Sequence, residues 1–373
     1  MKRIKLFLLS IVFVGMANAA NYYVDPAKAD DSGNGTSWLT AKKTIAAAYT
    51  AAIGAGTWNN ILVKGGIIDF TSTQTMGVTA NFYGSCAGNE LSYTQRPLTD
   101  NDGNGIVEPW EFEFPTTLRF TSVNADALKL PSGSGIVFDG FTITHTGTSS
   151  SGAFKTLTLQ TSTCQFKNNS IKDCDVTVKM TGSTFGILIK VVGNFTNNLI
   201  ENNRVTVNAT ADGTCAPTLE VAAGARVAQC LIRNNRVIMD YSTGTTGNSN
   251  ARGLIMLVTP SASAPYTSVS SCVIHNNEMA FTGNASNLTM SNGSTVALTN
   301  TASATDSVYN CTIANNKGTT VSTAFNHAGM KIFYTTATDA TSTVHYIKNN
   351  VCWNNYKSDG TININSPLSS SKL

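Results

Sequence analysis

Residues 100–111 carry oxygen-bearing side chains at the spacing of a calcium-binding loop. The segment reads DNDGNGIVEPWE, with Gly105 at the sixth position, where such a loop turns sharply. The expected ligands are the side chains of Asp100, Asp102 and Asn104, the carbonyl of Ile106, Glu108 directly or through a water molecule, and both carboxylate oxygens of Glu111.

The ion expected in this loop is a structural Ca²⁺. Pro97 and Pro109 flank the segment, so the helices of an EF-hand are not expected, and the loop reads as an insertion into a β protein. The alternative is a solvated Asp/Gly turn without an ion. The match at six ligand positions favours calcium, which would stiffen the insertion without taking part in catalysis.

Residues for hydrolysis or elimination are less well defined. Glycoside hydrolysis needs two carboxylates roughly 5 to 10 Å apart, and Asp173 and Asp175 are the close pair in the repeat region. A lyase would need a base and a cation beside a uronate. The available side chains have no distinctive spacing: His145, Lys155, Arg226 and Arg252. We find no serine-hydrolase elbow, Walker loop or zinc cluster in the sequence.

The elements that position these residues follow from an internal repeat. Six segments align: NSIKDCDVTV from Asn169, NLIENNRVTV from Asn198, CLIRNNRVIM from Cys230, CVIHNNEMAF from Cys272, CTIANNKGTT from Cys311 and HYIKNNVCWN from His345. Unequal spacing around a constant block indicates constant strands joined by variable loops. In each block the first residue and the Ile two positions later share a buried face, so the repeated cysteines and His345 are expected in the core.

Two further strands complete each repeat. One follows each Asn pair, and another lies between blocks, as in GILIKV from Gly186 and TLEVAA from Thr218. Each repeat thus has three strands that are rich in β-branched residues, and each strand stacks on its copy in the next repeat. This pattern predicts an all-β, right-handed parallel β-helix with three strands per coil. The Asn pairs are predicted to form turns and an internal amide ladder.

Charged residues flank the Asn turns in two outward columns. These are Lys172, Glu201, Arg233, His275, Ala314 and Lys348 on one side, and Asp175, Arg204, Arg236, Glu278 and Lys317 on the other. An extended polysaccharide could contact such a stripe, in which charges recur at about 4.8 Å per coil. The mixed signs favour a solvated face with ion pairs such as Glu201 with Arg233.

The first residues predict export. MKRIK, an apolar run and Ala17-Asn18-Ala19 form a secretory signal, and about a dozen apolar residues are too few to span a bilayer that needs roughly 20. Without Lys2, Arg3 and Lys5 of this signal, the chain carries 22 basic and 22 acidic side chains. A net charge near zero gives the protein no broad attraction for nucleic acid. We expect a monomer that is secreted or on the outer cell surface, with no transmembrane segment.

Three stretches resemble the secreted bacterial right-handed parallel β-helix proteins of the pectin-lyase-like type. They are NYYVDPAKADDSGNGTSWLTAKKTIAAA near the mature terminus, FYGSCAGNELSYTQR from Phe82 and FDGFTIT from Phe138. The resemblance implies the fold and export. The proteins of this type include lyases, hydrolases and surface proteins without assigned activity. Ser85-Cys86 departs from the expected Gly-Phe. Trp38–Ala52, with Thr36 or Ser37 as N-cap, is predicted to be a helix covering the first coil.

The predicted organisation is a signal peptide at 1–19, a cap and first coils with the calcium loop at 20–116, a parallel β-helix at 117–365 and a tail at 366–373. The sequence predicts an exported or cell-surface β-helix protein that is non-catalytic and either adhesin-like or a binder of an extracellular polysaccharide or cell-surface glycan. The alternative is a polysaccharide lyase or glycoside hydrolase.

Overall fold

A computed structural model describes residues 19–56, 58–77, 79–121, 123, 126–130, 133–134, 136–147, 155–159, 165–167, 170–172, 175–180, 187–209, 219–222, 224–241, 255–258, 266–283, 294–299, 305–320, 331–335 and 344–353. The predicted leader up to residue 18, Asp173, Arg252 and the predicted tail lie outside the described residues. The predicted domain boundaries stay predictions.

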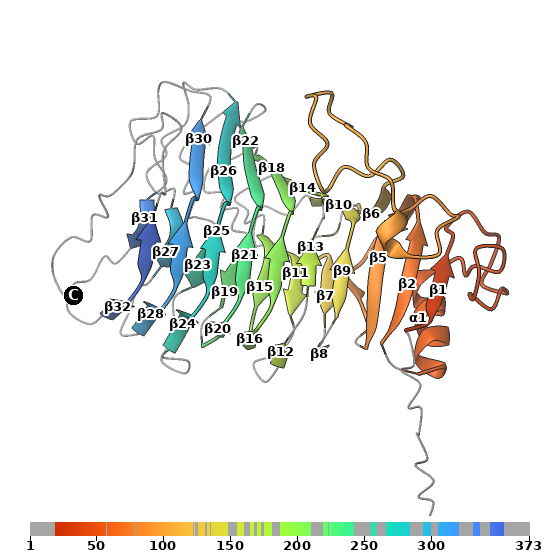
Figure 1. The fold of residues 1–373 in the computed structure, drawn as a ribbon, viewed down its shortest axis with the longest axis horizontal. Helices are drawn as coiled ribbons and strands as arrows, with labels where there is room; N and C mark the ends of the chain where they lie inside the picture. The colour runs from red at the N-terminus through yellow and green to blue at the C-terminus, as the bar shows by residue number, and fades with distance from the viewer. Residues whose placement is uncertain are drawn as a thin grey trace, which may run out of the picture.

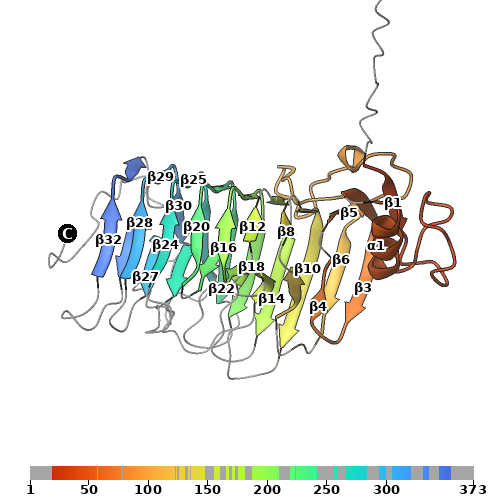
Figure 2. The ribbon, with the colours of Figure 1, turned by 90° about the horizontal axis from the view of Figure 1, so that it is seen from below.

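Within the described residues, the strands form four parallel sheets that run along the length of a β-helix (Figures 1 and 2). Sheet A consists, in stacking order, of β1 (Asn21–Val24), β2 (Asn59–Lys64), β5 (Ala80–Cys86), β9 (Val137–Asp139), β13 (Ser170–Lys172), β17 (Leu199–Glu201), β21 (Leu231–Arg233), β25 (Val273–His275), β29 (Thr312–Ala314) and β33 (Val351–Trp353). Sheet B consists of β3 (Gly66–Phe70), β6 (Thr116–Phe120), β10 (Phe141–Gly147), β14 (Asp175–Met180), β18 (Arg204–Ala209), β22 (Arg236–Tyr241), β26 (Glu278–Gly283) and β30 (Lys317–Thr320).

The other two sheets complete each coil. Sheet C consists of β4 (Gln74–Thr75), β7 (Leu128–Leu130), β11 (Lys155–Leu159), β15 (Ile187–Val191), β19 (Leu219–Val221), β23 (Ile255–Val258), β27 (Ser294–Thr299) and β31 (Lys331–Thr335). Sheet D consists of β8 (Gly133–Ser134), β12 (Gln165–Lys167), β16 (Asn194–Thr196), β20 (Arg226–Ala228), β24 (Tyr266–Ser270), β28 (Thr305–Tyr309) and β32 (Val344–Lys348). The predicted parallel β-helix is confirmed, and sheet D adds a short fourth strand to the predicted three.

The predicted isoleucine column forms the core of sheet A. Ile200, Ile232, Ile274 and Ile313 lie in register on successive strands and are fully buried. The repeated cysteines are buried beside them, as predicted, and each thiol donates to the carbonyl two residues earlier: Cys230 to Ala228, Cys272 to Ser270 and Cys311 to Tyr309.

The predicted register of the sixth repeat is wrong by five residues. Cys352, not Ile347, pairs with Ile313, and Asn350 accepts a hydrogen bond from the backbone amide of Cys311 at 2.9 Å. His345 therefore does not continue the cysteine column; it pairs with Asp306 in sheet D. Each coil turns twice on similar residues, five positions apart, so the Asn pair of the sequence fits either turn.

Both turns use the left-handed backbone region that Asn tolerates. The φ angle is 55° at Asn310 and at Asn315, and the same pair of turns recurs in neighbouring coils. After the second turn, the buried side chains of Asn203, Asn235, Asn277 and Asn316 form an amide ladder, with Nδ2 to Oδ1 distances of 2.9, 3.0 and 2.9 Å. The predicted internal ladder is confirmed.

Helix α1 (Ile45–Gly54) covers the N-terminal end of the solenoid against β1 and β2 (Figure 2). It begins seven residues later than predicted, and Thr44 is its N-cap, accepting from the amide of Ala47 at 3.2 Å. The carboxylate of Asp31 accepts from the amide of Thr44 at 2.9 Å and holds the preceding segment as a non-helical turn. Leu39 is consequently 85% exposed. No helix in the described part of the chain is long and apolar enough to cross a membrane.

Candidate calcium loop and outer face

The predicted calcium segment belongs to an insertion between β5 and β6, drawn in orange in Figure 1. The insertion contains the short 3₁₀ helix η1 (Tyr93–Gln95) and no α-helix. Its base is closed by an antiparallel bridge between Leu98 and Phe112 and by the amide of Thr99, which donates to the carbonyl of Glu111 at 2.9 Å. The loop therefore projects from an extended stem instead of from paired helices.

Asp100 organises the turn at the start of the loop. Its carboxylate accepts from the backbone amides of Gly103, Asn104 and Gly105 at 2.7, 3.2 and 2.8 Å. Gly103 and Gly105 have φ angles of 72° and 84°, which residues other than glycine rarely adopt. These amide bonds, led by that of Gly105, lower the pKa of Asp100 and keep its carboxylate charged.

Three of the predicted ligands meet in the structure. Carboxylate oxygens of Asp100, Asp102 and Glu111 lie within 4.8 Å of one another. Glu111 is only 1% exposed, and within the described residues its Oε1 atom has no hydrogen-bond partner. Burial and the neighbouring carboxyl of Glu108 raise the pKa of Glu111. A buried, unpartnered carboxylate oxygen beside two other carboxylates suits a bound cation, and hard oxygen ligands of this kind suit Ca²⁺.

The other predicted ligands lie nearby. Asn104 donates from Nδ2 to Oε1 of Glu108 at 3.1 Å, and its Oδ1 accepts from the amide of Ile106. Ile106 is 63% exposed at the tip of the loop. The roles of Asn104, Glu108 and the Ile106 carbonyl as calcium ligands stay predictions, as does the ion itself.

The loop is docked on a coil far along the solenoid. Nη1 of Arg204, at the start of β18, lies 3.6 Å from Oδ2 of Asp102, and its guanidinium lies 5.8 Å from the ring centroid of the buried Trp110. In sheet B, β18 is three strands beyond β6. This contact was not predicted, although a tryptophan inside an acidic loop was a signal that the loop is packed against something.

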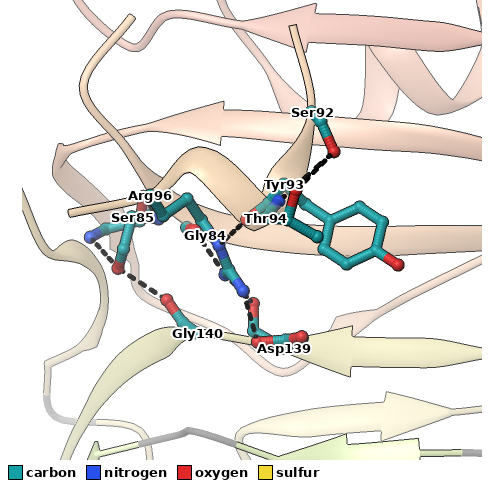
Figure 3. A network of polar contacts seen from close by, with 9 residues as sticks. Gly84, Ser85, Ser92, Tyr93, Thr94, Arg96, Asp139 and Gly140 are labelled. Carbon is teal, nitrogen blue, oxygen red and sulfur yellow. Dashed lines mark hydrogen bonds and ion pairs between the residues drawn. The ribbon is translucent and has the colours of Figure 1, made fainter. Parts of the chain in front are cut away.

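A buried ion pair anchors the stem of the insertion (Figure 3). Arg96 donates from Nη2 to Oδ1 of Asp139 at 2.8 Å, from Nη1 to the carbonyl of Gly84 at 2.9 Å and from Nε to the carbonyl of Tyr93 at 2.7 Å. Its guanidinium also lies 4.7 Å from the ring centroid of Phe112. Both charges are almost fully buried, so each depends on the other for compensation.

The segment FYGSCAGNE from Phe82, part of one of the three stretches that carry the resemblance, has a structural explanation. The buried carboxylate of Glu90 accepts from the backbone amides of Ala87, Gly88 and Asn89, the last two at 2.8 and 3.1 Å. The carbonyl of Glu90 accepts from the indole of Trp38 at 2.9 Å. The motif thus ties the first coils to the N-terminal segment.

The two outward columns carry ion pairs, as the solvated-face interpretation predicts. Arg233 Nε lies 2.5 Å from Oε2 of Glu201. In the second column Glu278 lies between Arg236 and Lys317, at 3.5 and 3.4 Å. The prediction that Lys348 ends the first column is wrong. Trp353 follows Ala314 in that column, whereas Lys348 pairs with Tyr309 in sheet D.

The candidate catalytic residues do not assemble into one site in the described residues. His145 is fully buried, with Nε2 3.0 Å from the carbonyl of Val123 and its ring edge-on to Phe120. Asp175 lies in register with Arg204, and Arg226 is exposed in β20 on a different sheet. The backbone of Lys155 begins β11, which belongs to sheet C.

No family model matches the chain, and no curated protein matches it. Several solved structures resemble it in outline. The A-module of mannuronan C-5 epimerase AlgE4 from Azotobacter vinelandii is 10% identical, with 88% of this chain and 95% of that chain covered and a TM-score of 0.26. An alginate lyase from Paenibacillus sp. is 12% identical, with 79% and 97% covered and a TM-score of 0.28.

A tailspike protein of the E. coli bacteriophage HK620, in complex with a pentasaccharide, is 10% identical, with 81% of this chain and 60% of that chain covered and a TM-score of 0.26. Likenesses this weak say nothing of activity. The assignment of the parallel β-helix rests on the strand pairing.

Proposed function

We propose that the chain is an exported, monomeric β-helix that binds an extracellular polysaccharide or cell-surface glycan without cleaving it. Binding takes place along the outer face of sheet A. The loop at residues 100–111 binds Ca²⁺, which stiffens the insertion. When bound, the ion neutralises the clustered carboxylates, while Asp100, Asp102 and Glu111 hold it.

The observation that carries the proposal is the outer face of sheet A, where the residue before and the residue after each buried core residue form two columns. The residue before the Ile is apolar at Leu199, Leu231 and Val273, and Val351 takes the same position before Cys352. Val273 and Val351 are 39% and 61% exposed. The residue after the Ile is charged or polar in neighbouring coils, as at Glu201, Arg233 and His275. Both columns repeat once per coil, at about 4.8 Å.

This repeat suits an extended sugar chain. Successive sugar rings present C–H faces, which an apolar column can cover, and hydroxyl groups, to which charged side chains can hydrogen-bond. Contacts distributed over many coils also suit a long chain better than a small ligand. The balanced charge of the chain makes nucleic acid a poor ligand by comparison.

A non-catalytic role is favoured by the state of the acids. In the described residues, Glu201 and Glu278 are held in ion pairs, and Asp139 is buried against Arg96. Among the described residues, the carboxylates that gather in a group of three are those of the loop. A lyase or hydrolase remains the alternative, with Asp175 as its candidate acid or base, and Asp175→Asn would then abolish product formation.

The proposal is tested by affinity electrophoresis of the purified protein in gels that contain a panel of acidic and neutral polysaccharides. Arg233→Ala is expected to weaken retention by the bound polysaccharide roughly tenfold, a typical effect of losing one charged contact. Arg119→Ala is the matched control, because Arg119 is also an exposed arginine paired with a carboxylate, that of Asp69, but lies on sheet B. Equal effects of both variants, or no retention by any polysaccharide, would contradict the proposal.

A further inference from the structure

The solenoid begins unevenly at its N-terminal end. Sheet A starts with β1, whereas the first described strands of sheets B and C, β3 and β4, belong to the following coil, that of β2. Helix α1 takes the place of the missing strands, and it packs mainly on β1 and β2 (Figure 2). The end of the core beneath sheets B and C is therefore covered only in part.

A cavity of about 700 Å³ lies between α1 and the strands β3 and β4. Its floor is the core of the solenoid, formed by Ile68, Phe70, Met76, Phe82, Leu118 and Leu128. Polar side chains line it as well, among them Lys43, Thr50 and Asp69. On one side Tyr49 reaches Gly77, where a Cβ atom would lie 1.9 Å from the tyrosine ring.

The strand beside this cavity has an unpaired edge. In the described residues, β3 is the terminal strand of sheet B and pairs with β6 alone. The amide of Gly66 donates to Pro115, and the carbonyl of Phe70 accepts from Thr121. In a parallel sheet successive residues point their main-chain groups to opposite sides. Those of Ile67 and Asp69 therefore face away from β6, toward the open edge.

We infer that this end of the solenoid is a docking site for an extended polypeptide segment of a partner protein. The segment adds to the open edge of β3 as a further strand, and its alternate apolar side chains enter the cavity. The unpaired main-chain groups call for a strand, and the apolar floor calls for apolar side chains at every second position. A sugar chain would leave its hydroxyl groups unpaired against this floor.

The segment fits better than a second folded copy of this chain. The stretch between β1 and α1 forms a loop that extends beyond β1 at this end of the molecule (Figure 1). This loop would keep another solenoid from approaching the β3 edge end to end. A single extended segment is narrow enough to lie beside the base of this loop, where Pro26, Lys43 and Thr44 line the cavity.

The test uses a fluorescent heptapeptide, Thr-Thr-Leu-Arg-Phe-Thr-Ser, which has the sequence of residues 116–122 and hence the inward Leu and Phe of β6. Its binding to the purified protein is measured by fluorescence anisotropy. Two further peptides carry N-methyl groups on alternate amides, one in each phase, so that one of them cannot bond to β3. Thr50→Trp fills the cavity mouth, and Ile53→Trp is the control, because Ile53 is 41% exposed and outside the cavity lining.

We expect saturable binding with a Kd on the order of 10–100 μM, at least tenfold weaker binding to Thr50→Trp, unchanged binding to Ile53→Trp, and loss of binding for one N-methylated peptide. No saturable binding up to about 1 mM would overturn the inference. Equal affinity of all three peptides would also overturn it, since main-chain pairing would then play no part. Self-association of the protein that Thr50→Trp abolishes would make the occupant a second copy.

Discussion

Replacing Glu111 by Gln should abolish the effect of calcium on the loop while leaving the calcium-free loop intact. Gln keeps the shape of the side chain, but it removes the negative charge that sits buried beside the carboxylates of Asp100, Asp102 and Glu108. Without calcium the variant loses a repulsion, so its loop is expected to be at least as stable as the unchanged one. With calcium it lacks the ligand that would contribute both oxygens.

The magnitude follows from linkage between calcium binding and loop opening. Calcium at 100 times its Kd stabilises the closed loop by about 2.7 kcal/mol. Loss of a ligand that supplies two oxygens should weaken binding by about 100-fold, the upper end of the range for even an outer-shell partner. At the same calcium concentration about 0.4 kcal/mol then remains. The variant therefore loses about 2.3 kcal/mol of calcium-dependent stabilisation.

Chymotrypsin cleavage reports this stabilisation, because Trp110 and Phe112 are only 8% and 5% exposed in the closed loop. When opening is fast, the cleavage rate follows the open population. Calcium should slow cleavage of the unchanged protein about 100-fold and that of Glu111→Gln only about twofold. Glu113→Gln, an exposed neighbour, should behave as the unchanged protein. Equal protection of Glu111→Gln, or no protection of the unchanged protein, would refute the calcium site.

Two further predictions concern the scaffold. Asn235→Ala should lower the free energy of unfolding by about 2 to 4 kcal/mol in a urea titration, because it removes the buried ladder bond to Asn277 and leaves neighbouring polar groups unpaired; a loss under about 0.5 kcal/mol would show that water replaces the ladder. Gly140→Ala should destabilise the protein far more than Gly103→Ala in the same titration. Both have φ near +73°, at 74° and 72°, but a Cβ at Gly140 would lie 2.1 Å from Nη1 of Arg96, whereas nothing lies within 4 Å at Gly103. Equal effects would mean that backbone strain alone accounts for the loss.

The repeat in the sequence was sufficient to predict the solenoid, because period-two alternation and stacking are properties of each coil and its neighbour. Ile200 and Ile232 illustrate this, since each can be placed from its own block. The register of the last coil was not predictable in the same way. Asn310 and Asn315 both turn the chain with φ of 55°, so an Asn pair fits either turn, and only the strand pairing distinguishes them.

In the calcium loop too, the sequence predicts what neighbouring residues determine, but not the contact with a distant coil. The spacing of Asp100, Asp102 and Glu111 was readable because the loop closes on itself within twelve residues. The contact of Asp102 with Arg204 joins residues about a hundred positions apart in sequence, and it depends on how the insertion lies across three strands of sheet B. No pattern in the sequence encodes that direction.

The proposed function is tested most directly by incubating the purified protein, with and without calcium, with a panel of acidic and neutral polysaccharides. Retention of the protein on each polysaccharide is measured together with unsaturated products and new reducing ends. We expect saturable retention by at least one polysaccharide and no product. Release of unsaturated or reducing-end products would contradict the non-catalytic proposal, and uniform absence of retention would contradict glycan binding.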